Sequence, residues 1–251
     1  MAEKPRFYEG RLSKIVSLSE TVKHFVLDYA PSADLSFTAG QFLMAHLEKD
    51  GKPHKKAYSI ASSPTLALEK KQIELCIKRV EGGYVSTWFF GLKEGDVIRT
   101  SLPHGVFTVK EPWQENLVFV GTGTGIAPLR GMIHKLYESG CDKEIWLVFG
   151  NRYETDILYD EEWRALEKER RNFHYLPTIS RPKHWTGETA YVQEVVKKTF
   201  ARHQDSGGTA GGAQGDLDFY GCGLVPMCQE LKAALLQMNV PKERIHFEQF
   251  T

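Results

Sequence analysis

The chain has 251 residues, of which 41% are hydrophobic and 25% charged, and its 32 Lys and Arg balance its 32 Asp and Glu. This is the composition of a globular protein with one large or two ordinary domains, and the zero net charge gives no sign of a nucleic-acid or acidic-membrane surface. No apolar stretch is long enough to span a bilayer, and the first residues lack the apolar core of a signal peptide. The four cysteines form no C-x-x-C pair, which argues against bound zinc or an iron–sulfur cluster. We therefore expect a cytoplasmic protein with reduced thiols and no metal.

The first part of the chain, up to about Pro112, predicts short β-strands. Runs rich in β-branched and aromatic residues, bounded by turn signals, lie at residues 10–16, 22–27, 41–47, 57–60 and 73–80. Their regular spacing predicts an antiparallel β-barrel, with one helix near residues 85–92.

After Pro112, strand-like runs alternate with helical patterns. We expect strands at residues 117–120, 144–149, 173–179, 218–220 and 246–250, and helices from residue 128 and at 159–170, 191–200 and 225–238. This alternation predicts βαβ units and a parallel sheet with helices on both faces. We place the boundary near Pro112, which gives domains at residues 1–112 and 113–251. The low-complexity segment Ser206–Gly215 is expected to be a mobile loop.

The most informative motif is Gly121-Thr122-Gly123-Thr124-Gly125, which follows an apolar strand and precedes a helix with Pro128 in its first turn. Glycines let the backbone approach an anion, and the free N–H groups of a helix start favour a phosphate. The spacing is not G-x-G-x-x-G, because Ile126 takes the place of the last glycine. The alternative is an ordinary glycine-rich turn with no ligand.

Two segments of the first part could also meet a phosphorylated ligand. Lys56-Ala57-Tyr58-Ser59 offers a cation, an aromatic ring and a hydroxyl, which suit a phosphate, a planar ring and a polar edge. Further on, Cys76-Ile77-Lys78 leads into Gly82-Gly83-Tyr84-Val85-Ser86-Thr87, where glycines and hydroxyls at a helix start suit an anion. The alternatives are an ordinary strand and a hairpin turn followed by a capped helix. One such helix start in each half favours two phosphorylated ligands, one per domain.

The order and spacing of these segments resemble the ferredoxin–NADP reductase superfamily of flavoproteins over nearly the whole chain. Lys56-Ala57-Tyr58-Ser59 is similar to the family's flavin motif R-x-Y-S, and Gly82 to Thr87 to its G-G-x-x-S/T segment. Pro103-His104-Gly105-Val106-Phe107 resembles its P-x-G-x-F element, and Cys222-Gly223-Leu224-Val225-Pro226-Met227 resembles its C-G-x-x-x-M motif. The end of the chain, Phe247-Glu248-Gln249-Phe250, resembles the family's acidic-aromatic terminus. Lys56 departs from the family arginine, since lysine keeps the charge but loses the planar two-point fork.

The resemblance implies a flavin-binding antiparallel β-barrel followed by an α/β nucleotide-binding domain, with FAD and NADP(H), or else NAD(H), as cofactors. It implies hydride transfer between NADPH and flavin N5 and single-electron transfer with a ferredoxin, a flavodoxin or a similar carrier. Ser59, Cys222 and Glu248 would be the catalytic residues, with Ser59 near flavin N5 and Cys222 beside nicotinamide C4. The implied cofactor-binding residues are Lys56, Ala57, Tyr58, Ser59, Cys76, Ile77, Lys78, Gly83, Val85, Ser86, Thr87, Gly121, Thr122, Gly123, Thr124, Gly125, Pro128, Asn151, Arg152, Ser180, Arg181, Cys222, Gly223, Met227 and Phe250, the last as a flavin shield.

The stretch Ser180-Arg181, with Lys183 close by, favours NADPH over NADH. A hydroxyl, a guanidinium and an amine suit an adenosine 2′-phosphate, whereas an acidic residue would suit a bare ribose, and no acid follows in this stretch before Glu188. Asn151-Arg152 is expected to assist. The alternative reading of the whole chain is an NADH-dependent electron-transfer subunit that serves a cytochrome or an oxygenase complex.

Overall fold

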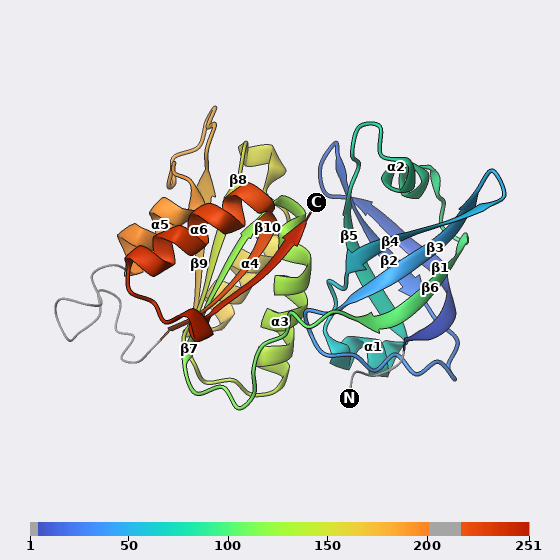
Figure 1. Ribbon diagram of the computed structural model, residues 1–251, viewed down its shortest axis with the longest axis horizontal. Helices are drawn as coiled ribbons and strands as arrows, with labels where there is room; N and C mark the ends of the chain where they lie inside the picture. The colour runs from blue at the N-terminus through green and yellow to red at the C-terminus, as the bar shows by residue number, and fades with distance from the viewer. Residues whose placement is uncertain (1–4, 201–216, 251) are drawn as a thin grey trace. The chain divides into compact units, whose positions relative to one another are not determined.

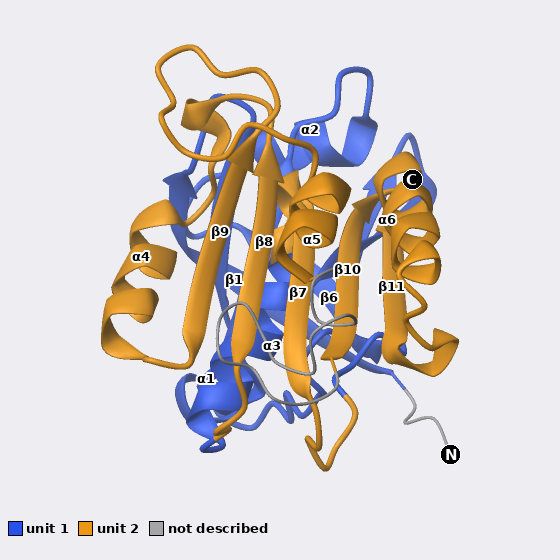
Figure 2. Cartoon of the chain, turned by 90° about the vertical axis from the view of Figure 1, so that its left-hand side faces the viewer, with its two compact units in different colours: residues 1–109, 127–140 blue, residues 110–126, 141–251 orange. Residues whose placement is uncertain are grey.

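The computed structural model describes residues 5–200 and 217–250, so the predicted loop Ser206–Gly215 lies outside the described residues. The chain divides into two compact units (Figure 2). Unit 1 comprises residues 1–109 and 127–140, and unit 2 comprises residues 110–126 and 141–251. Since this grouping follows packing rather than chain order, the single boundary at Pro112 stays a prediction.

Unit 1 is built on a six-stranded antiparallel sheet with the strand order β4-β3-β6-β1-β2-β5 (Figure 1). Its strands are β1 (Arg6–Ser17), β2 (Val22–Asp28), β3 (Phe42–Lys49), β4 (Lys52–Ser59), β5 (Gln72–Lys78) and β6 (Val97–His104). An isolated bridge between Ile60 and Leu75 joins the chain after β4 to β5, the opposite edge strand. The sheet therefore curls into the predicted barrel.

The barrel core is formed by alternate residues of these strands, because successive side chains of a strand point to opposite faces. Leu12, Phe25, Leu43 and Ile98 are almost fully buried in one cluster. Two short helices, α1 (Pro64–Lys70) and α2 (Tyr84–Gly91), complete this part of unit 1. Ser63 caps α1, since its Oγ accepts a hydrogen bond from the Leu66 N–H.

Unit 2 contains a five-stranded parallel sheet with the order β11-β10-β7-β8-β9. Its strands are β7 (Asn116–Thr122), β8 (Ile145–Asn151), β9 (Phe173–Ile179), β10 (Leu217–Leu224) and β11 (Ile245–Phe250). Its helices are α4 (Asp160–Glu169), α5 (Val192–Phe200) and α6 (Val225–Gln237). The predicted α/β alternation is confirmed element by element.

Helices lie on both faces of this sheet. One buried cluster joins Val196 of α5, Leu231 of α6 and Val148 of β8, as the position of α5 and α6 against the strands in Figure 2 illustrates. On the other face, Trp163 of α4 packs against Phe173 of β9, with ring centroids 6.2 Å apart. Within residues 5–200 and 217–250, no helix has the length and apolar composition of a membrane span.

Helix α3 (Ile126–Glu138) follows the glycine motif, and from Ala127 onward it packs with unit 1. The Arg130 guanidinium contacts the Glu74 carboxylate at 2.5 Å and donates to the Ala61 carbonyl at 2.8 Å. Gly131 lies so close to the segment after β4 that a Cβ there would be 2.8 Å from the Ser62 carbonyl oxygen. A glycine in mid-helix is therefore required by backbone packing.

We expect Gly131→Ala to lower the free energy of unfolding by about 1–3 kcal/mol, because the added methyl group meets backbone that cannot move aside cheaply. Alanine would otherwise favour a helix by up to about 1 kcal/mol over glycine. The matched control is Gly91→Ala at the end of α2, where a Cβ would meet nothing within 4 Å. Urea denaturation of both variants provides the measurement, and equal stability of the two would contradict the packing argument.

Candidate functional site

The end of β4 brings together the predicted flavin residues of unit 1. Lys56 and Ala57 are exposed, Tyr58 is half-buried and Ser59 is buried. The Tyr58 ring meets Phe89 of α2 edge to face, with centroids 4.9 Å apart. Lys56 and Tyr58 lie on the same face of β4, since side chains alternate along a strand. A cation and an aromatic ring are therefore presented on the face that α2 covers.

β5 supplies the next group of predicted residues beside the end of β4. Cys76 and Ile77 are buried and Lys78 is exposed at the end of the strand. The Ile60–Leu75 bridge holds this part of β5 against the chain that follows Ser59. Burial raises the pKa of Tyr58, so its hydroxyl remains protonated at neutral pH.

The start of α2 offers backbone donors to an anion. Gly83 is the N-cap and has no side chain to bond the first-turn N–H groups, which have no acceptor within a helix. Gly82 has φ +71°, and a Cβ there would meet nothing within 4 Å. The Ser86 hydroxyl already donates to the Gly83 carbonyl and accepts from the Val80 N–H inside the turn, and its predicted contact with a cofactor stays a prediction. An anion here would be bound by backbone N–H groups.

In unit 2 the glycine motif lies where the strand order reverses. β8 and β9 extend from β7 to one side of the sheet, and β10 and β11 extend to the other. Ligands of open parallel sheets bind beyond the carboxyl ends of the strands at such a switch point. The chain passes from Thr122 through a 3₁₀ turn, Gly123–Gly125, into α3, with Pro128 in the first helical turn as predicted. Gly123 has φ +52°, a left-handed conformation that favours glycine, and a Cβ there would meet nothing within 4 Å.

Two glycines allow this loop and β10 to pack closely. A Cβ on Gly125 would lie 2.1 Å from the Cys222 carbonyl oxygen, and one on Gly223 would lie 2.5 Å from the Thr122 Oγ1. Gly121 and Cys222 are register partners on β7 and β10. The predicted phosphate loop and the predicted catalytic cysteine are therefore neighbours.

Cys222 and Glu248 lie side by side on β10 and β11. Cys222 is fully buried, and burial, followed by the charges of Glu248 and Cys228, raises its pKa well above the usual value. The thiol is therefore neutral at physiological pH. Phe250 is the partner of Leu224 two residues further along these strands. Met227, also a predicted cofactor contact, packs against the core of the sheet.

The carboxyl ends of β8 and β9 carry the residues predicted for the adenosine end. The Ser180 N–H donates to the Asn151 carbonyl at 3.0 Å, and the Arg181 N–H to the Arg152 carbonyl at 2.9 Å. Both arginine side chains are exposed. The Asn151 side chain is only 9% exposed, and its Nδ2 finds no acceptor among the described residues. Buried polar groups are usually hydrogen-bonded, so this amide can donate to a water molecule or to a bound ligand.

The structure adds one residue that sequence reasoning missed. Glu154 accepts hydrogen bonds from the Lys183 N–H at 2.7 Å and the His184 N–H at 2.5 Å. Backbone N–H groups, its own first and then that of His184, lower the pKa of Glu154 to about 2. Glu154 reaches the stretch after Ser180 from the 3₁₀ turn Glu154–Asp156 that follows β8. In the sequence, the position of Glu154 two residues after Arg152 was the feature that could have suggested a place near the adenosine end of the nucleotide.

Comparison with known proteins agrees with this geometry. Residues 9–109 match the model of the oxidoreductase FAD-binding domain, and residues 119–233 that of the oxidoreductase NAD-binding domain. Ferredoxin–NADP reductase B of Sorangium cellulosum is 33% identical over 249 residues, which cover 97% of each chain. The chain belongs to the ferredoxin–NADP reductase family.

A second relative is longer than this chain. The phenol hydroxylase P5 protein of Acinetobacter pittii is 31% identical over 247 residues, and the chain spans 65% of that protein's length. Among solved structures, a ferredoxin NADP⁺ reductase from Neisseria gonorrhoeae with bound FAD and NADP has a TM-score of 0.81 at 19% identity, covering 97% of this chain and 98% of that one. An Amycolatopsis cytochrome P450 reductase, GcoB, has a TM-score of 0.84 at 23% identity, covering 100% of this chain and 71% of that one. These two likenesses show the shared fold.

This member of the ferredoxin–NADP reductase family is thus an NAD(P)H-dependent flavoprotein reductase with an FAD-binding and an NAD(P)-binding domain. The described residues fit both cofactors. The start of α2, which has no side-chain cap, suits a flavin phosphate, and the glycine turn between β7 and α3 at the switch point of the sheet suits a nucleotide phosphate. The roles of the individual site residues stay predictions.

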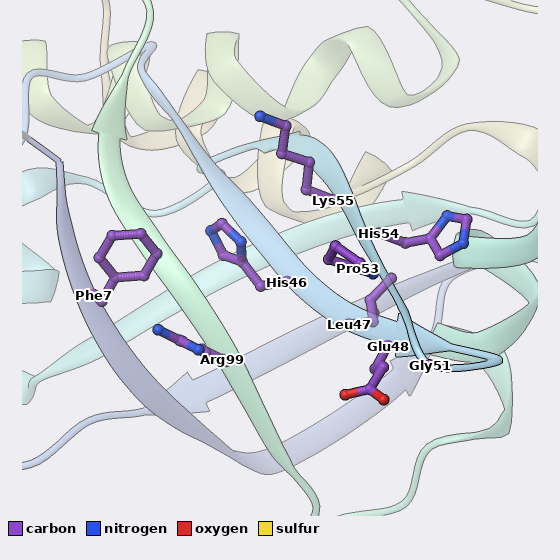
Figure 3. A pocket seen from close by; sticks show the side chains of 9 residues that line it. All are labelled: Phe7, His46, Leu47, Glu48, Gly51, Pro53, His54, Lys55 and Arg99. Carbon is purple, nitrogen blue, oxygen red and sulfur yellow. The ribbon is translucent and has the colours of Figure 1, made fainter.

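A groove of about 690 Å³ on the outer face of the barrel lies outside the predicted flavin residues (Figure 3). Arg99, His46 and Lys55 line it from three adjacent strands, where Arg99 is the register partner of His46 and His46 that of Lys55. The Arg99 guanidinium lies over the Phe7 ring, 5.1 Å from its centroid. Among the described residues neither Arg99 nor Lys55 forms an ion pair, so their charges act directly on His46.

We expect Arg99→Gln to raise the pKa of His46. Burial, then the charges of Arg99, Lys55 and His104, hold this pKa below its ordinary value, and removing a nearby cation stabilises the protonated ring. NMR titration of the histidine ring protons measures the shift. Lys49→Gln is the control, since it removes a cation of β3 that does not act on His46, and an identical titration curve for wild type and Arg99→Gln would contradict the prediction.

Proposed function

We propose that the protein oxidises NADPH and passes the electrons through FAD, one at a time, to a ferredoxin, a flavodoxin or a similar carrier protein. The observation that carries the proposal is the pairing of Gly121 with Cys222, which joins a phosphate loop to a neutral thiol at the switch point of the sheet. Residues 1–112 would hold FAD, and residues 113–251 the nucleotide.

The bound cofactors supply the redox chemistry, since flavin accepts a hydride from reduced nicotinamide and releases single electrons. The chain's own residues bind and orient them. Tyr58 presents an aromatic face with a protonated hydroxyl, and Ser59 offers a hydrogen bond from a buried position beside it. Backbone N–H groups at the start of α2, with the Lys56 ammonium on the same side, would bind the flavin phosphates.

Cys222 and Glu248 are proposed to position the nicotinamide ring. The buried Cys222 thiol is small and uncharged, so it excludes water without repelling the neighbouring Glu248 carboxylate. Glu248 would orient the ring or hold a proton near it. Gly223, which has no space for a side chain, keeps the backbone after Cys222 close to Thr122. Phe250, further along β11, would cover the flavin.

NADPH is proposed as the preferred nucleotide because of the charges at the ends of β8 and β9. Arg152 and Arg181 are held together by a backbone hydrogen bond, and Ser180 adds a hydroxyl beside them. Guanidinium groups bind a 2′-phosphate through charge-assisted hydrogen bonds. Use of NADH in addition is compatible with the acidic Glu154 nearby.

The proposed partner is a small one-electron carrier. The ferredoxin–NADP reductase of Sorangium cellulosum aligns with nearly the whole chain, which supports this partner class. The second candidate is an NADH-dependent subunit that serves a cytochrome or an oxygenase, and it is favoured by the 31% identity with the phenol hydroxylase component. Steady-state rates with ferredoxin, flavodoxin and cytochrome c as acceptors would separate the two candidates.

We expect the purified protein to be yellow, to release FAD on denaturation and to be bleached by anaerobic addition of one equivalent of NADPH. The expectation follows from one flavin site and one nucleotide site in the chain. Visible absorption spectra during the titration, with chromatography of the released cofactor, provide the measurement. A protein that binds NADPH but holds no flavin after reconstitution with FAD would overturn the proposal.

We expect Cys222→Ala to slow flavin reduction by NADPH roughly ten- to a hundredfold, because a small displacement of the nicotinamide is costly for hydride transfer. Flavin content should not change, since Cys222 belongs to the nucleotide half of the chain. Stopped-flow absorbance at the flavin band measures the rate. Cys141→Ala, another buried thiol of unit 2, is the control, and an equal effect of both substitutions would argue for a general loss of packing.

A further inference from the structure

The loops that follow β8 and β9 are joined by a continuous set of backbone interactions. The N–H groups of Ser180 and Arg181 bond to the carbonyls of Asn151 and Arg152, and the Glu154 carboxylate makes the next hydrogen bonds between the two segments. Its Oε1 accepts from the N–H groups of both Lys183 and His184. Glu154 thus fixes the loop that carries Ser180 and Arg181, two of the residues proposed to bind the 2′-phosphate.

No cationic side chain in residues 5–200 and 217–250 forms an ion pair with Glu154. Among the described residues no ion pair joins it to Arg152, Arg181 or Lys183, although all three belong to the same pair of loops. The Lys183 ammonium instead lies over the Tyr153 ring, 5.3 Å from its centroid. A full negative charge is therefore held by backbone N–H groups next to the cations that would bind a phosphate.

This arrangement acts differently on the two nucleotides. A carboxylate repels the doubly charged 2′-phosphate of NADPH, while it tolerates or accepts a hydrogen bond from the 2′-hydroxyl of NADH. Because Arg152 and Arg181 are exposed, water screens the repulsion between the carboxylate and a phosphate bound there, and the effect on affinity is expected to be roughly three- to tenfold. The hydrogen bonds from Glu154 to the loop after β9, in contrast, fix the conformation of that loop and should favour binding of both nucleotides.

We propose that Glu154 is a specificity-determining residue that orders the adenosine-binding loop through backbone hydrogen bonds while its charge restrains the preference for NADPH over NADH. The inference rests on the proposed function, since it assumes that the 2′ position of the nucleotide lies beside Arg152 and Arg181. It makes the reductase competent with both nucleotides despite its two arginines.

The test separates charge from hydrogen bonding. Glu154→Gln keeps an acceptor oxygen and removes the charge, so we expect it to tighten binding of adenosine 2′,5′-bisphosphate roughly three- to tenfold and to leave binding of 5′-AMP unchanged. Glu154→Ala removes the acceptor as well, and we expect it to weaken binding of 5′-AMP. Calorimetric titration of the FAD-loaded protein measures both probes without reference to turnover. Glu154→Gln should accordingly lower the KM for NADPH and leave that for NADH unchanged, and Glu154→Ala should raise the KM for NADH. The kcat values should not change.

Matched variants complete the experiment. Glu161→Gln, which removes an exposed acid at the start of α4, should change neither affinity. Arg181→Ala should weaken binding of adenosine 2′,5′-bisphosphate and leave binding of 5′-AMP unchanged. The inference is overturned where Glu154→Gln leaves the bisphosphate affinity unchanged or alters both probes equally. The proposed function fails separately where the wild-type protein binds neither probe.

Discussion

The nucleotide site depends on how closely β10 and the loop after β7 approach each other. Gly125 and Gly223 occupy the contact, and at each position a side chain would overlap with the neighbouring strand or loop. A Cβ at Gly125 would lie 2.1 Å from a backbone oxygen, which no rotamer change relieves. Cys222 is a register partner of Gly121 in this closely packed region, and the roles proposed for the two residues depend on that proximity.

Backbone N–H groups are a shared part of the predicted phosphate sites at the two helix starts, one in each half of the chain. The hydroxyl of Ser86, which the sequence offered as an anion ligand, instead closes the turn that orients the start of α2. In unit 2 the glycine turn Gly123–Gly125 likewise leads into a helix start, where backbone N–H groups are available to an anion. Backbone donors are fixed by the fold and do not have to lose side-chain freedom on binding, so a site of this type is preorganised. The replacement of the family arginine by Lys56 is easier to accommodate in such a site.

The sequence predicted every strand of the parallel sheet, because most of them are apolar runs between clear helical patterns. It predicted β10 too short, at residues 218–220 instead of Leu217–Leu224, since two glycines interrupt the apolar residues of that strand. It missed β6, where Thr100 is fully buried and bonded to the Tyr29 hydroxyl, so the strand does not show the usual apolar and polar alternation. It missed α1, which is only seven residues long. Glu154 could not be predicted as part of the adenosine loop, since its partners at 183 and 184 are brought to it by the pairing of β8 with β9.

The zero net charge of the chain does not describe the electrostatic potential at individual sites. The chain carries equal numbers of acids and bases, yet the acids are often paired, as Glu74 is with Arg130 and Asp160 with Arg164. In the described residues the cations at the barrel groove and at the ends of β8 and β9 form no ion pair. These cations are therefore local sources of positive potential, and a protein with no net charge can still attract an anionic ligand at such places.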